Sequence, residues 1–288
     1  MSTSVSKPAE VGVPPSAPKA VTPHAPDWAA LSDRGRQRRN NEDAWGAFAL
    51  DSQLSPLTPG RSTWPAHGVL YVVSDGMGGA RAGEEASRFC VARLVVELET
   101  RLESADAGSA MREAFLATHA ALVELGRGNP DWQGMGATLS ALWLLPNGSL
   151  VLGHVGDSRV YSGRGGQWRQ LTDDHTMGEG LVRRGTMTAE AASRFKFRGL
   201  LEQVMGGDGR AIDPQIVLAG WQAEDGFALC SDGLYRTLAE GLETQLNTAL
   251  RRANPADGAQ LLVDGANAAG GPDNITVVLA RLAMTGDK

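Results

Sequence analysis

The sequence predicts an α+β protein in which antiparallel β-sheets are covered by pairs of helices. Runs with strand character follow one another in groups and are interrupted by paired helical segments, whereas proteins with parallel sheets alternate regularly between the two. Glycine makes up 36 of the 288 residues, and many glycines stand in Gly-Gly, Asn-Gly or Asp-Gly pairs that mark tight turns. With 42% apolar residues the chain can bury a substantial core.

The first 27 residues differ in composition from the rest of the chain. They are rich in Pro, Ala, Ser and Val, a mixture that cannot sustain a core. We therefore expect a disordered tail at 1–27 and one folded domain at 28–284. The tail is either a partner-binding segment or a leader without a function of its own.

The first half of the domain alternates between strand and helix patterns. Strands are expected at 44–50 and 69–74, separated by a long loop, and helical spacing of apolar residues predicts helices at 82–102 and 107–125. An Asn-Gly turn predicts a hairpin with strands at 138–145 and 150–154. Short strands at 159–162 and 167–171 surround a Gly-Gly pair. We expect this middle region to form one antiparallel meander.

The second half begins with a basic helical segment at 176–207, followed by strands at 215–218 and 227–230. Two helical patterns at 239–252 and 255–268 predict another helix pair, and an apolar run at 275–282 predicts a closing strand. No fixed-period repeat is present.

Charge and cysteine content exclude several classes of protein. A formal net charge of −6 argues against a nucleic-acid partner, because phosphate backbones demand a cationic face. Cys90 and Cys230 allow at most one disulfide and no cysteine zinc pair. No apolar stretch approaches the ~20 residues of a membrane span, and the N-terminus lacks a secretory pattern. We expect a cytoplasmic protein without a membrane span.

Five short acidic motifs carry the chemical signal, and three of them place an aspartate directly beside glycine at the end of an apolar run. Strand ends of this kind can bring several carboxylates together around hard metal ions. The motifs are Asn41-Glu42-Asp43, Ser74-Asp75-Gly76-Met77-Gly78-Gly79, Gly156-Asp157-Ser158-Arg159, Ser231-Asp232-Gly233 and Gly271-Pro272-Asp273-Asn274.

Each aspartate also has an ordinary structural explanation. Asp75 and Asp232 follow apolar runs, and either could cap a helix or close a turn. Asp273 precedes the last strand, so it can face the same sheet edge from the opposite chain direction, or simply belong to a turn. The occurrence of all three in one chain favours a metal site over the structural explanations.

The ordered motifs resemble those of metal-dependent protein phosphatases of the type 2C family, in a bacterial form. Besides the acidic motifs, the resemblance includes Arg38-x-x-x-Glu42-Asp43 and Gly134-Met135-Gly136-Ala137-Thr138, and it spans residues 30–282. It implies a sandwich of two antiparallel β-sheets flanked by helix pairs, with a binuclear metal centre at one edge.

The resemblance also implies roles for single residues. Asp75 would bridge two metal ions, the carbonyl of Gly76 would bind one of them, and Asp232 and Asp273 would hold the other. Oxygen ligands of this kind suit Mn²⁺ or Mg²⁺ rather than zinc or copper. Two such ions can activate a water that hydrolyses the phosphoester directly, without a phosphoenzyme.

Three further acidic residues have less direct roles in the resemblance. Glu42 and Asp43 would act mainly through waters on the ions. Asp157 would join Asp232 in binding a possible third, weaker ion, although Asp157 also suits a turn between strands.

Arg38 is the candidate phosphate anchor and a candidate catalytic residue beside Asp75 and Asp232. A guanidinium can donate two parallel hydrogen bonds to a phosphoryl group. Arg38 belongs to a basic run that, by itself, suits a solvated or nucleic-acid-attracting patch. The four-residue spacing to Glu42 distinguishes Arg38 from the other arginines of this run. The chain departs from the eukaryotic branch at Met77, where a histidine is the proposed general acid.

His154 and His175 are the candidate replacements for that acid. His154 lies in an apolar strand and suits a packed core position, and His175 suits the cap of the following helix. The basic segment at 177–207 corresponds to the flap beside the active site in bacterial relatives, where its charges either steer an acidic phosphopeptide or face solvent.

The predicted function is hydrolysis of phosphoserine and phosphothreonine in proteins, reversing a protein kinase. The expected partners are phosphorylated proteins, including a Ser/Thr protein kinase or its substrates. A small-molecule phosphatase on the same fold and a catalytically weak docking module remain alternatives. Intact Asp75, Asp232 and Asp273 argue against the docking module, because a decayed metal site loses ligands.

Overall fold

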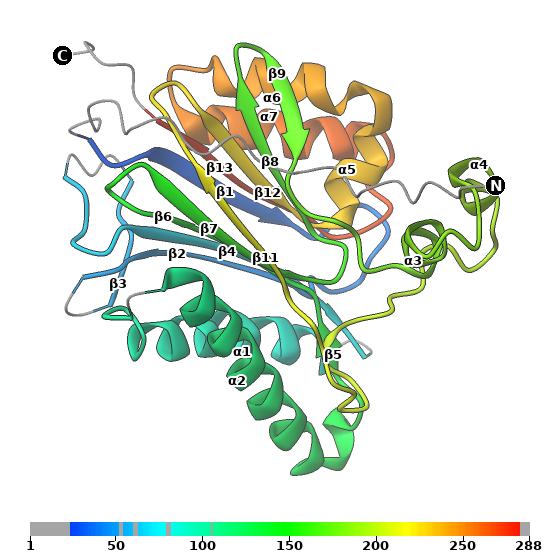
Figure 1. Cartoon of the computed structure of the whole chain (residues 1–288). Coiled ribbons are helices and arrows are strands. Elements are labelled where there is room, and N and C mark those ends of the chain that lie inside the picture. The colour runs from blue at the N-terminus through cyan, green and yellow to red at the C-terminus, as the bar shows by residue number, and fades with distance from the viewer. Residues whose placement is uncertain (1–23, 52–53, 60–62, 79–81, 105, 283–288) are drawn as a thin grey trace, which may run out of the picture.

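Two antiparallel β-sheets pack face to face, and helices cover the outer face of each sheet (Figure 1). The computed structural model describes residues 24–51, 54–59, 63–78, 82–104 and 106–282. This architecture confirms the predicted α+β sandwich. Of the tail predicted at 1–27, residues 1–23 lie outside the described residues, and Asp27 already belongs to the first strand.

The smaller sheet joins the two ends of the described chain. In its five strands the order is β1-β13-β12-β8-β9, so the first strand pairs with the last. The closing strand and the strand before it were predicted, whereas the first strand was not. The strands are β1 (Asp27–Asp33), β8 (Arg159–Arg164), β9 (Gln167–Gln170), β12 (Gly226–Cys230) and β13 (Ile275–Arg281).

The larger sheet has eight strands with the order β10-β5-β4-β6-β7-β11, and β2 pairs with β4 and with β3. The predicted hairpin at 138–154 is confirmed as β6 and β7. The strands are β2 (Asp43–Ala49), β3 (Ser55–Pro56), β4 (Val69–Met77), β5 (Gly136–Ala137), β6 (Leu139–Leu144), β7 (Ser149–Val155), β10 (Met205–Gly206) and β11 (Gln215–Gly220).

Helix pairs cover the sheets as expected, with α1 and α2 against the larger sheet and α6 and α7 on the smaller one (Figure 1). The predicted helix at 255–268 has the observed bounds of α7. The helices are α1 (Ala82–Glu99), α2 (Ala107–Arg127), α3 (Met177–Arg183), α4 (Ala189–Ser193), α5 (Asp232–Leu238), α6 (Leu242–Leu250) and α7 (Pro255–Ala268), with single 3₁₀ turns η1 (Pro130–Trp132) and η2 (Ala239–Gly241).

Strand β4 shows why its sequence is a continuous apolar run. Successive strand residues point to opposite faces of a sheet. Leu70 and Val72 pack with the helices α1 and α2, whereas Val69, Tyr71 and Val73 pack into the interior of the sandwich. Because both faces are covered, no position of this run is polar, and the first polar residues after it mark the edge where the strand leaves the core.

Two sequence predictions are wrong at the level of elements. The middle region is not one meander, because β6 and β7 belong to the larger sheet and β8 and β9 to the smaller one. The chain crosses between the sheets at Gly156-Asp157-Ser158, and glycine suits this turn because its φ is +110°. The segment at 176–207 is mostly irregular, with α3 and α4 as short helices that project beside α5 (Figure 1).

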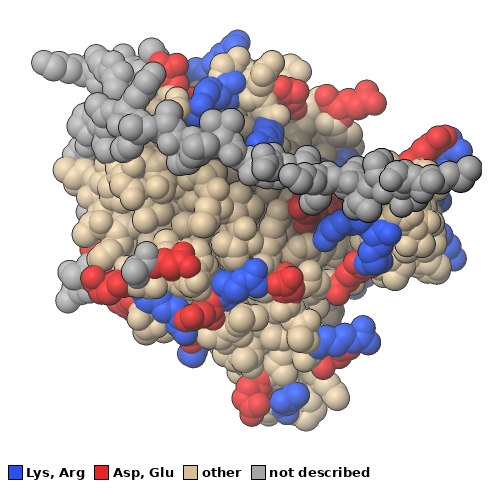
Figure 2. Space-filling model, viewed as in Figure 1, with Lys and Arg blue, Asp and Glu red and all other residues tan. Residues whose placement is uncertain are grey.

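No helix of the described residues is long and apolar enough to cross a bilayer. On the face shown in Figure 2, Lys and Arg side chains are interspersed with Asp and Glu and form no continuous cationic band.

Candidate active site

The acidic motifs meet at one edge of the sandwich because their strands end there. Asp43 opens β2 and lies directly opposite Asp75 of β4 in the antiparallel register. Asp232 follows β12 with one residue between them, and Asp273 stands two residues before the neighbouring strand β13. Strand β13 also contacts β2 and β4 across the sandwich. The two sheets therefore each supply two of these carboxylates.

The carboxylates lie close enough to affect one another's protonation. Burial raises the pKa of Asp75 well above its usual range, and the negative charges of the other four motif aspartates raise it further. Burial likewise raises the pKa of Asp43 to about 7, although hydrogen bonds to its carboxylate oppose the shift. We call this group the acidic cluster; it comprises Asp43, Asp75, Asp157, Asp232 and Asp273.

The chemistry of the acidic cluster fits a bound cation. Asp43 is 9% exposed, and its Oδ1 is buried without a hydrogen-bond partner, whereas its Oδ2 accepts a hydrogen bond of 2.7 Å from Ser231 Oγ. A buried carboxylate oxygen without a partner carries a large desolvation cost, which a metal ion or its hydration water removes. The oxygen-only donor set fits hard divalent ions such as Mg²⁺ and Mn²⁺.

The described side chains do not form a closed metal cage. No group of three or more His, Cys, Asp or Glu among them has the arrangement of a direct metal site. The open arrangement fits ions that keep several waters and take few protein ligands. Two arginines, Arg38 and Arg236, instead contact the outer carboxylates of the cluster.

Arg38 reaches the cluster from the loop between β1 and β2. Its Nη2 donates to Asp273 Oδ2 at 2.6 Å, and 53% of its side chain remains exposed. Burial lowers the pKa of Arg38, but the hydrogen bond and charge of Asp273, together with Asp75 and Glu42, raise it overall. The structure thus brings Arg38 to the acidic cluster, and its exposed guanidinium can also meet a ligand from solvent.

Asp157 and Asp232 share one arginine. Arg236 Nη2 donates to Asp157 Oδ2 at 2.6 Å, and Arg236 Nη1 lies 2.7 Å from Asp232 Oδ2. Burial is the main cause that raises the pKa of Asp157 to about 7 and also raises that of Asp232, while Arg236 lowers both. Asp157 lies on the crossover between the sheets, and Asp232 is the first residue of α5.

Glu42 and Gly76 lie next to each other across β2 and β4. The Gly76 N–H donates to the Glu42 carbonyl at 3.1 Å. A Cβ on Gly76 would collide with the Gly83 carbonyl and come within 2.8 Å of the Glu42 carbonyl oxygen, so this close approach of three backbones requires glycine. Burial raises the pKa of Glu42, Arg38 lowers it, and Asp273 and Glu84 raise it.

Asn274 is a positioning residue that the sequence did not reveal. Its Oδ1 accepts the Glu42 N–H at 2.9 Å, and its Nδ2 donates to the carbonyls of Arg34 and Asn40 at 2.9 and 2.8 Å. One amide therefore holds both ends of the loop that carries Arg38. The only available signal was its place directly after Asp273, where a turn explains an asparagine equally well.

Thr138 and Ser231 connect the cluster to the sheets. Thr138 Oγ1 accepts the Asp75 N–H at 2.9 Å and lies 2.6 Å from Ser158 Oγ beside Asp157. Ser231 Oγ donates to Asp43 and accepts the Thr276 N–H at 3.0 Å. Both residues belong to motifs of the resemblance, but their connecting role was not predicted, because a hydroxyl that links two polar groups has no distinctive spacing in a sequence.

His154 and His175 are buried next to each other, beside the crossover between the sheets. His154 is fully buried in β7, as predicted, and burial lowers its pKa to about 3. The prediction that His175 caps the next helix is wrong, because Thr176 is the N-cap of α3. The His175 ring is buried 4.9 Å from the His154 ring, and its Nδ1 accepts the Gly156 N–H at 3.3 Å.

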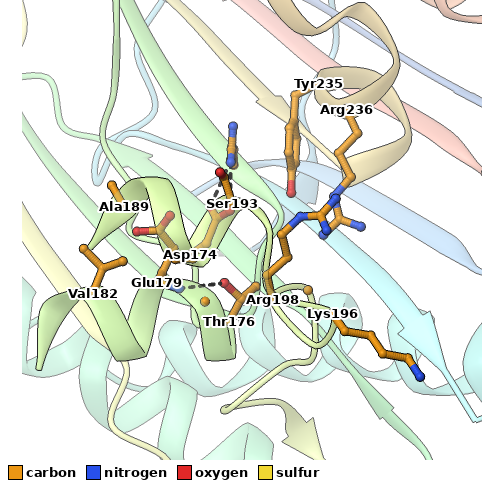
Figure 3. Close-up of a pocket in the computed structure, with 14 residues that line it drawn as sticks. Asp174, Thr176, Glu179, Val182, Ala189, Ser193, Lys196, Arg198, Tyr235 and Arg236 are labelled. Carbon is orange, nitrogen blue, oxygen red and sulfur yellow. Dashed lines mark hydrogen bonds and ion pairs between the residues drawn. The ribbon is translucent and has the colours of Figure 1, made fainter. Parts of the chain in front are cut away.

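A cleft of about 660 Å³ opens beside the cluster, between α5 and the segment that carries α3 and α4 (Figure 3). In Figure 3 the Arg236 side chain extends from α5 toward Arg198 on the opposite wall. Tyr235 and Arg159 also line the cleft, and Arg159 makes a double hydrogen bond with Asp174 at 2.9 and 2.8 Å. Both free cysteines are buried elsewhere in the sheets or helices.

The Protein phosphatase 2C family matches residues 60–264, which is most of the chain. The chain belongs to this family. Its solved relatives share the architecture: the crystal structure of the Mycobacterium tuberculosis serine/threonine phosphatase PstP superimposes with a TM-score of 0.73 and 33% identity, covering 90% of this chain and 99% of that one. A structure of the PstP catalytic domain in complex with two manganese ions gives a TM-score of 0.70 and 32% identity over the same share of this chain.

Curated relatives within the family bear consistent names. The serine/threonine protein phosphatase PstP of Mycobacterium tuberculosis is 36% identical over 253 residues, which cover 88% of this chain and 44% of that relative. The chain thus spans less than half the length of that phosphatase. The serine/threonine phosphatase stp of Listeria monocytogenes is 31% identical over 259 residues, covering 88% of this chain and 95% of the relative.

Proposed function

We propose that this phosphatase 2C protein is a metal-dependent hydrolase that removes phosphate from phosphoserine and phosphothreonine in proteins. The observation that carries the proposal is the convergence of the acidic cluster from both sheets around the unpartnered Asp43 Oδ1. The names of the relatives, serine/threonine phosphatases, support the reaction class. A relative solved with two manganese ions supports the dependence on metal.

The proposed metal centre holds two Mn²⁺ or Mg²⁺ ions. Asp75 would contact both, the Gly76 carbonyl one of them, and Asp232 and Asp273 the other. When bound, such ions activate water and neutralise charge on the phosphoryl group. Glu42 and Asp43 would act through hydrogen bonds to the hydration shell, because Asp43 uses one oxygen on Ser231.

Arg38 is the proposed phosphate anchor and contributes to catalysis by orienting the phosphoryl group. One terminal nitrogen of Arg38 donates a hydrogen bond to Asp273, and about half of the side chain is exposed. The guanidinium can therefore also donate to a phosphoryl group that arrives from solvent. Met77 ends β4 beside the cluster and offers no proton, so the leaving group must take its proton from water.

A protein substrate is favoured over a small molecule by the cleft beside Arg236. The cleft extends the site along α3 and α4, and we propose that a peptide segment beside the phosphorylated residue lies there. The proposed functional opponent is a Ser/Thr protein kinase in the same compartment, which we take to be the cytoplasm.

The proposed catalytic domain covers residues 28–284, with 1–27 as a tail outside it. Asp27 nevertheless contributes to the domain, because its carboxylate pairs with Arg281 at 3.2 Å between β1 and β13. A shortened chain should therefore begin before Asp27.

The test is phosphate release from a phosphothreonine peptide in Mn²⁺, in Mg²⁺ and in chelator. We expect activity with either ion, none in chelator, and losses of a hundredfold or more in Asp75→Asn and Asp232→Asn, because each change removes a charged ligand. Asp264→Asn is the matched control, since Asp264 is exposed on α7. Full activity in chelator, or in both site variants, would falsify the two-ion mechanism.

A further inference from the structure

Arg236 makes the same contacts that a cation between Asp157 and Asp232 would make. Its two terminal nitrogens each contact a different carboxylate, at 2.6 Å for Asp157 and 2.7 Å for Asp232. The two aspartate side chains are only 7% and 14% exposed, so the guanidinium carries most of the compensation for two desolvated charges.

The position of Arg236 follows from α5. Residues four apart lie on one face of a helix, and Arg236 stands four residues after Asp232. The crossover between the sheets brings Asp157 to the same face. The Arg236 guanidinium carbon also lies 5.8 Å from the Tyr235 ring centroid, and its Nη2 approaches Gly199 on the opposite wall of the cleft.

These contacts conflict with a third metal ion at Asp157 and Asp232. Arg236 already contacts one carboxylate oxygen of each residue, Asp157 Oδ2 and Asp232 Oδ2, and its guanidinium lies between the two carboxylates. An ion could enter only after the guanidinium has moved out, and a positive charge that stays nearby would still repel it. The residues present therefore fit a fixed arginine and do not fit a third divalent ion.

We propose that Arg236 is a built-in counter-cation that replaces a third metal ion, so that the protein binds two divalent ions and no more. The inference rests on the proposed function, because it assumes the two-ion centre. Arg236 is then a positioning residue: it fixes the Asp232 carboxylate through their ion pair. The same arginine lines the wall of the cleft (Figure 3).

The experiment counts the Mn²⁺ ions bound to the full chain. Chelator-treated protein is titrated with Mn²⁺ by calorimetry, and the bound metal is measured after equilibrium dialysis. We expect two ions in the wild type and a third, weaker ion in Arg236→Gln, bound at least about tenfold more tightly than any third ion in the wild type. Adding Asp157→Asn to Arg236→Gln should return the count to two.

Two further variants keep the test decisive. Arg194→Gln removes an exposed arginine at the end of α4, which pairs with Glu190, and should leave the count at two. Asp157→Asn with Arg236 intact should also leave two ions, because Asp157 then contacts arginine and not metal. This second variant decides the matter if Arg236→Gln does not fold, as judged by circular dichroism.

The outcomes separate the two proposals. The role of Arg236 is overturned if the wild type binds a third ion that disappears in Asp157→Asn. It is also overturned if folded Arg236→Gln binds no third ion. In both cases the two-ion centre stands. A wild type that binds no Mn²⁺ overturns the metal centre itself and with it this inference.

Discussion

The Arg38–Asp273 contact joins the proposed phosphate anchor to a proposed metal ligand. Asp273 holds the guanidinium at the edge of the acidic cluster, and Arg38 neutralises a carboxylate whose negative charge acts on Asp75. Binding of metal and phosphate would compete with this ion pair. The half-exposed arginine can leave it without unfolding any element, because its loop is held through Asn274 and not through Asp273.

The first prediction concerns Arg38→Ala. We expect KM for a phosphothreonine peptide to rise about tenfold or more, with a smaller fall in kcat, because charge-assisted hydrogen bonds to phosphate are lost. The KM of Arg38→Lys should lie between those of the wild type and Arg38→Ala, since an ammonium keeps the charge but does not reproduce the paired donors. Arg39→Ala is the neighbouring control and should match the wild type. Equal kinetics for both alanine variants would remove Arg38 from the site.

The second prediction concerns Asn274→Ala. The change leaves the Glu42 N–H and the Arg34 and Asn40 carbonyls without their partner, so we expect the free energy of unfolding to fall by about 1–3 kcal/mol. Phosphatase activity should fall further than stability alone explains, because the Arg38 loop loses its anchor. Chemical denaturation and steady-state kinetics measure the two effects.

Asn147→Ala is the control for that change, since Asn147 is exposed in the β6–β7 turn. We expect this change to lower the free energy of unfolding by less than about 1 kcal/mol and to leave kcat and KM unaltered. An Asn274→Ala protein with wild-type kinetics would show that the Arg38 loop keeps its shape without this amide.

At the scale of elements, the end of β4 is fixed by a hydroxyl outside it. Thr138 joins the Asp75 backbone to Ser158 on the crossover, and Ser74 Oγ donates to the Thr138 carbonyl at 2.6 Å. The distance between Asp75 and Asp157 therefore depends on a residue that carries no charge. This connection also explains why the crossover between the sheets lies beside the cluster.

The third prediction concerns Thr138→Val, which keeps the side-chain shape and removes the hydroxyl. We expect a loss of about 1–3 kcal/mol in the free energy of unfolding, because the Asp75 N–H loses its acceptor, and weaker Mn²⁺ binding by calorimetry. Thr138→Ser retains the oxygen and should bind Mn²⁺ as the wild type does. Identical Mn²⁺ affinity in all three proteins would show that Thr138 does not set the position of Asp75.

How far the sequence predicts this protein differs between elements. Continuous apolar runs and an Asn-Gly turn sufficed for β4, β6 and β7, because local chemistry determines them. Helix α5 was missed because seven residues show too little periodicity, and with it the four-residue relation between Asp232 and Arg236 was missed. The assignment of β8 to the other sheet depends on long-range pairing with β12, which no local pattern encodes.

At the scale of the whole molecule, the sandwich followed from the resemblance to a family and not from periodicity. Alternating patterns show which residues are buried but not which sheet covers them. The sequence predicted Asp75, Asp232 and Asp273 as site residues, and the structure brings them together at one edge of the sandwich. Asn274 and Arg236 were not nominated, because their roles depend on partners that lie far away along the chain or on an unpredicted helix.

The fourth prediction concerns His154, which is buried in β7 between β6 and β11. Burial, with help from His175 and Arg159, lowers its pKa to about 3, although backbone groups of Gly156 and Asp173 oppose the shift. The unfolded chain takes up a proton near pH 6.5 and the folded protein does not, so this contribution to stability is present above pH 6.5 and is lost as pH falls toward 3.

His154→Gln isolates this contribution from the carboxylates, whose raised pKa values act in the opposite direction. The difference in unfolding free energy between wild type and variant should shift by about 2 kcal/mol against the wild type between pH 7 and pH 5. Denaturant titrations at the two pH values measure it. A constant difference would mean that His154 titrates in the folded state near its ordinary pKa.

The pairing of β1 with β13 determines when the site can come into existence. Asp43 and Asp273 are separated by most of the chain, and β13, which follows Asp273, lies between β1 and β12. Contacts of such large sequence separation form slowly, because the loop entropy must be overcome before they contribute. During synthesis, while β13 is still inside the ribosome, the nascent chain lacks the central region of the smaller sheet and one proposed metal ligand. Catalytic competence should therefore appear abruptly, late in the folding of the described residues.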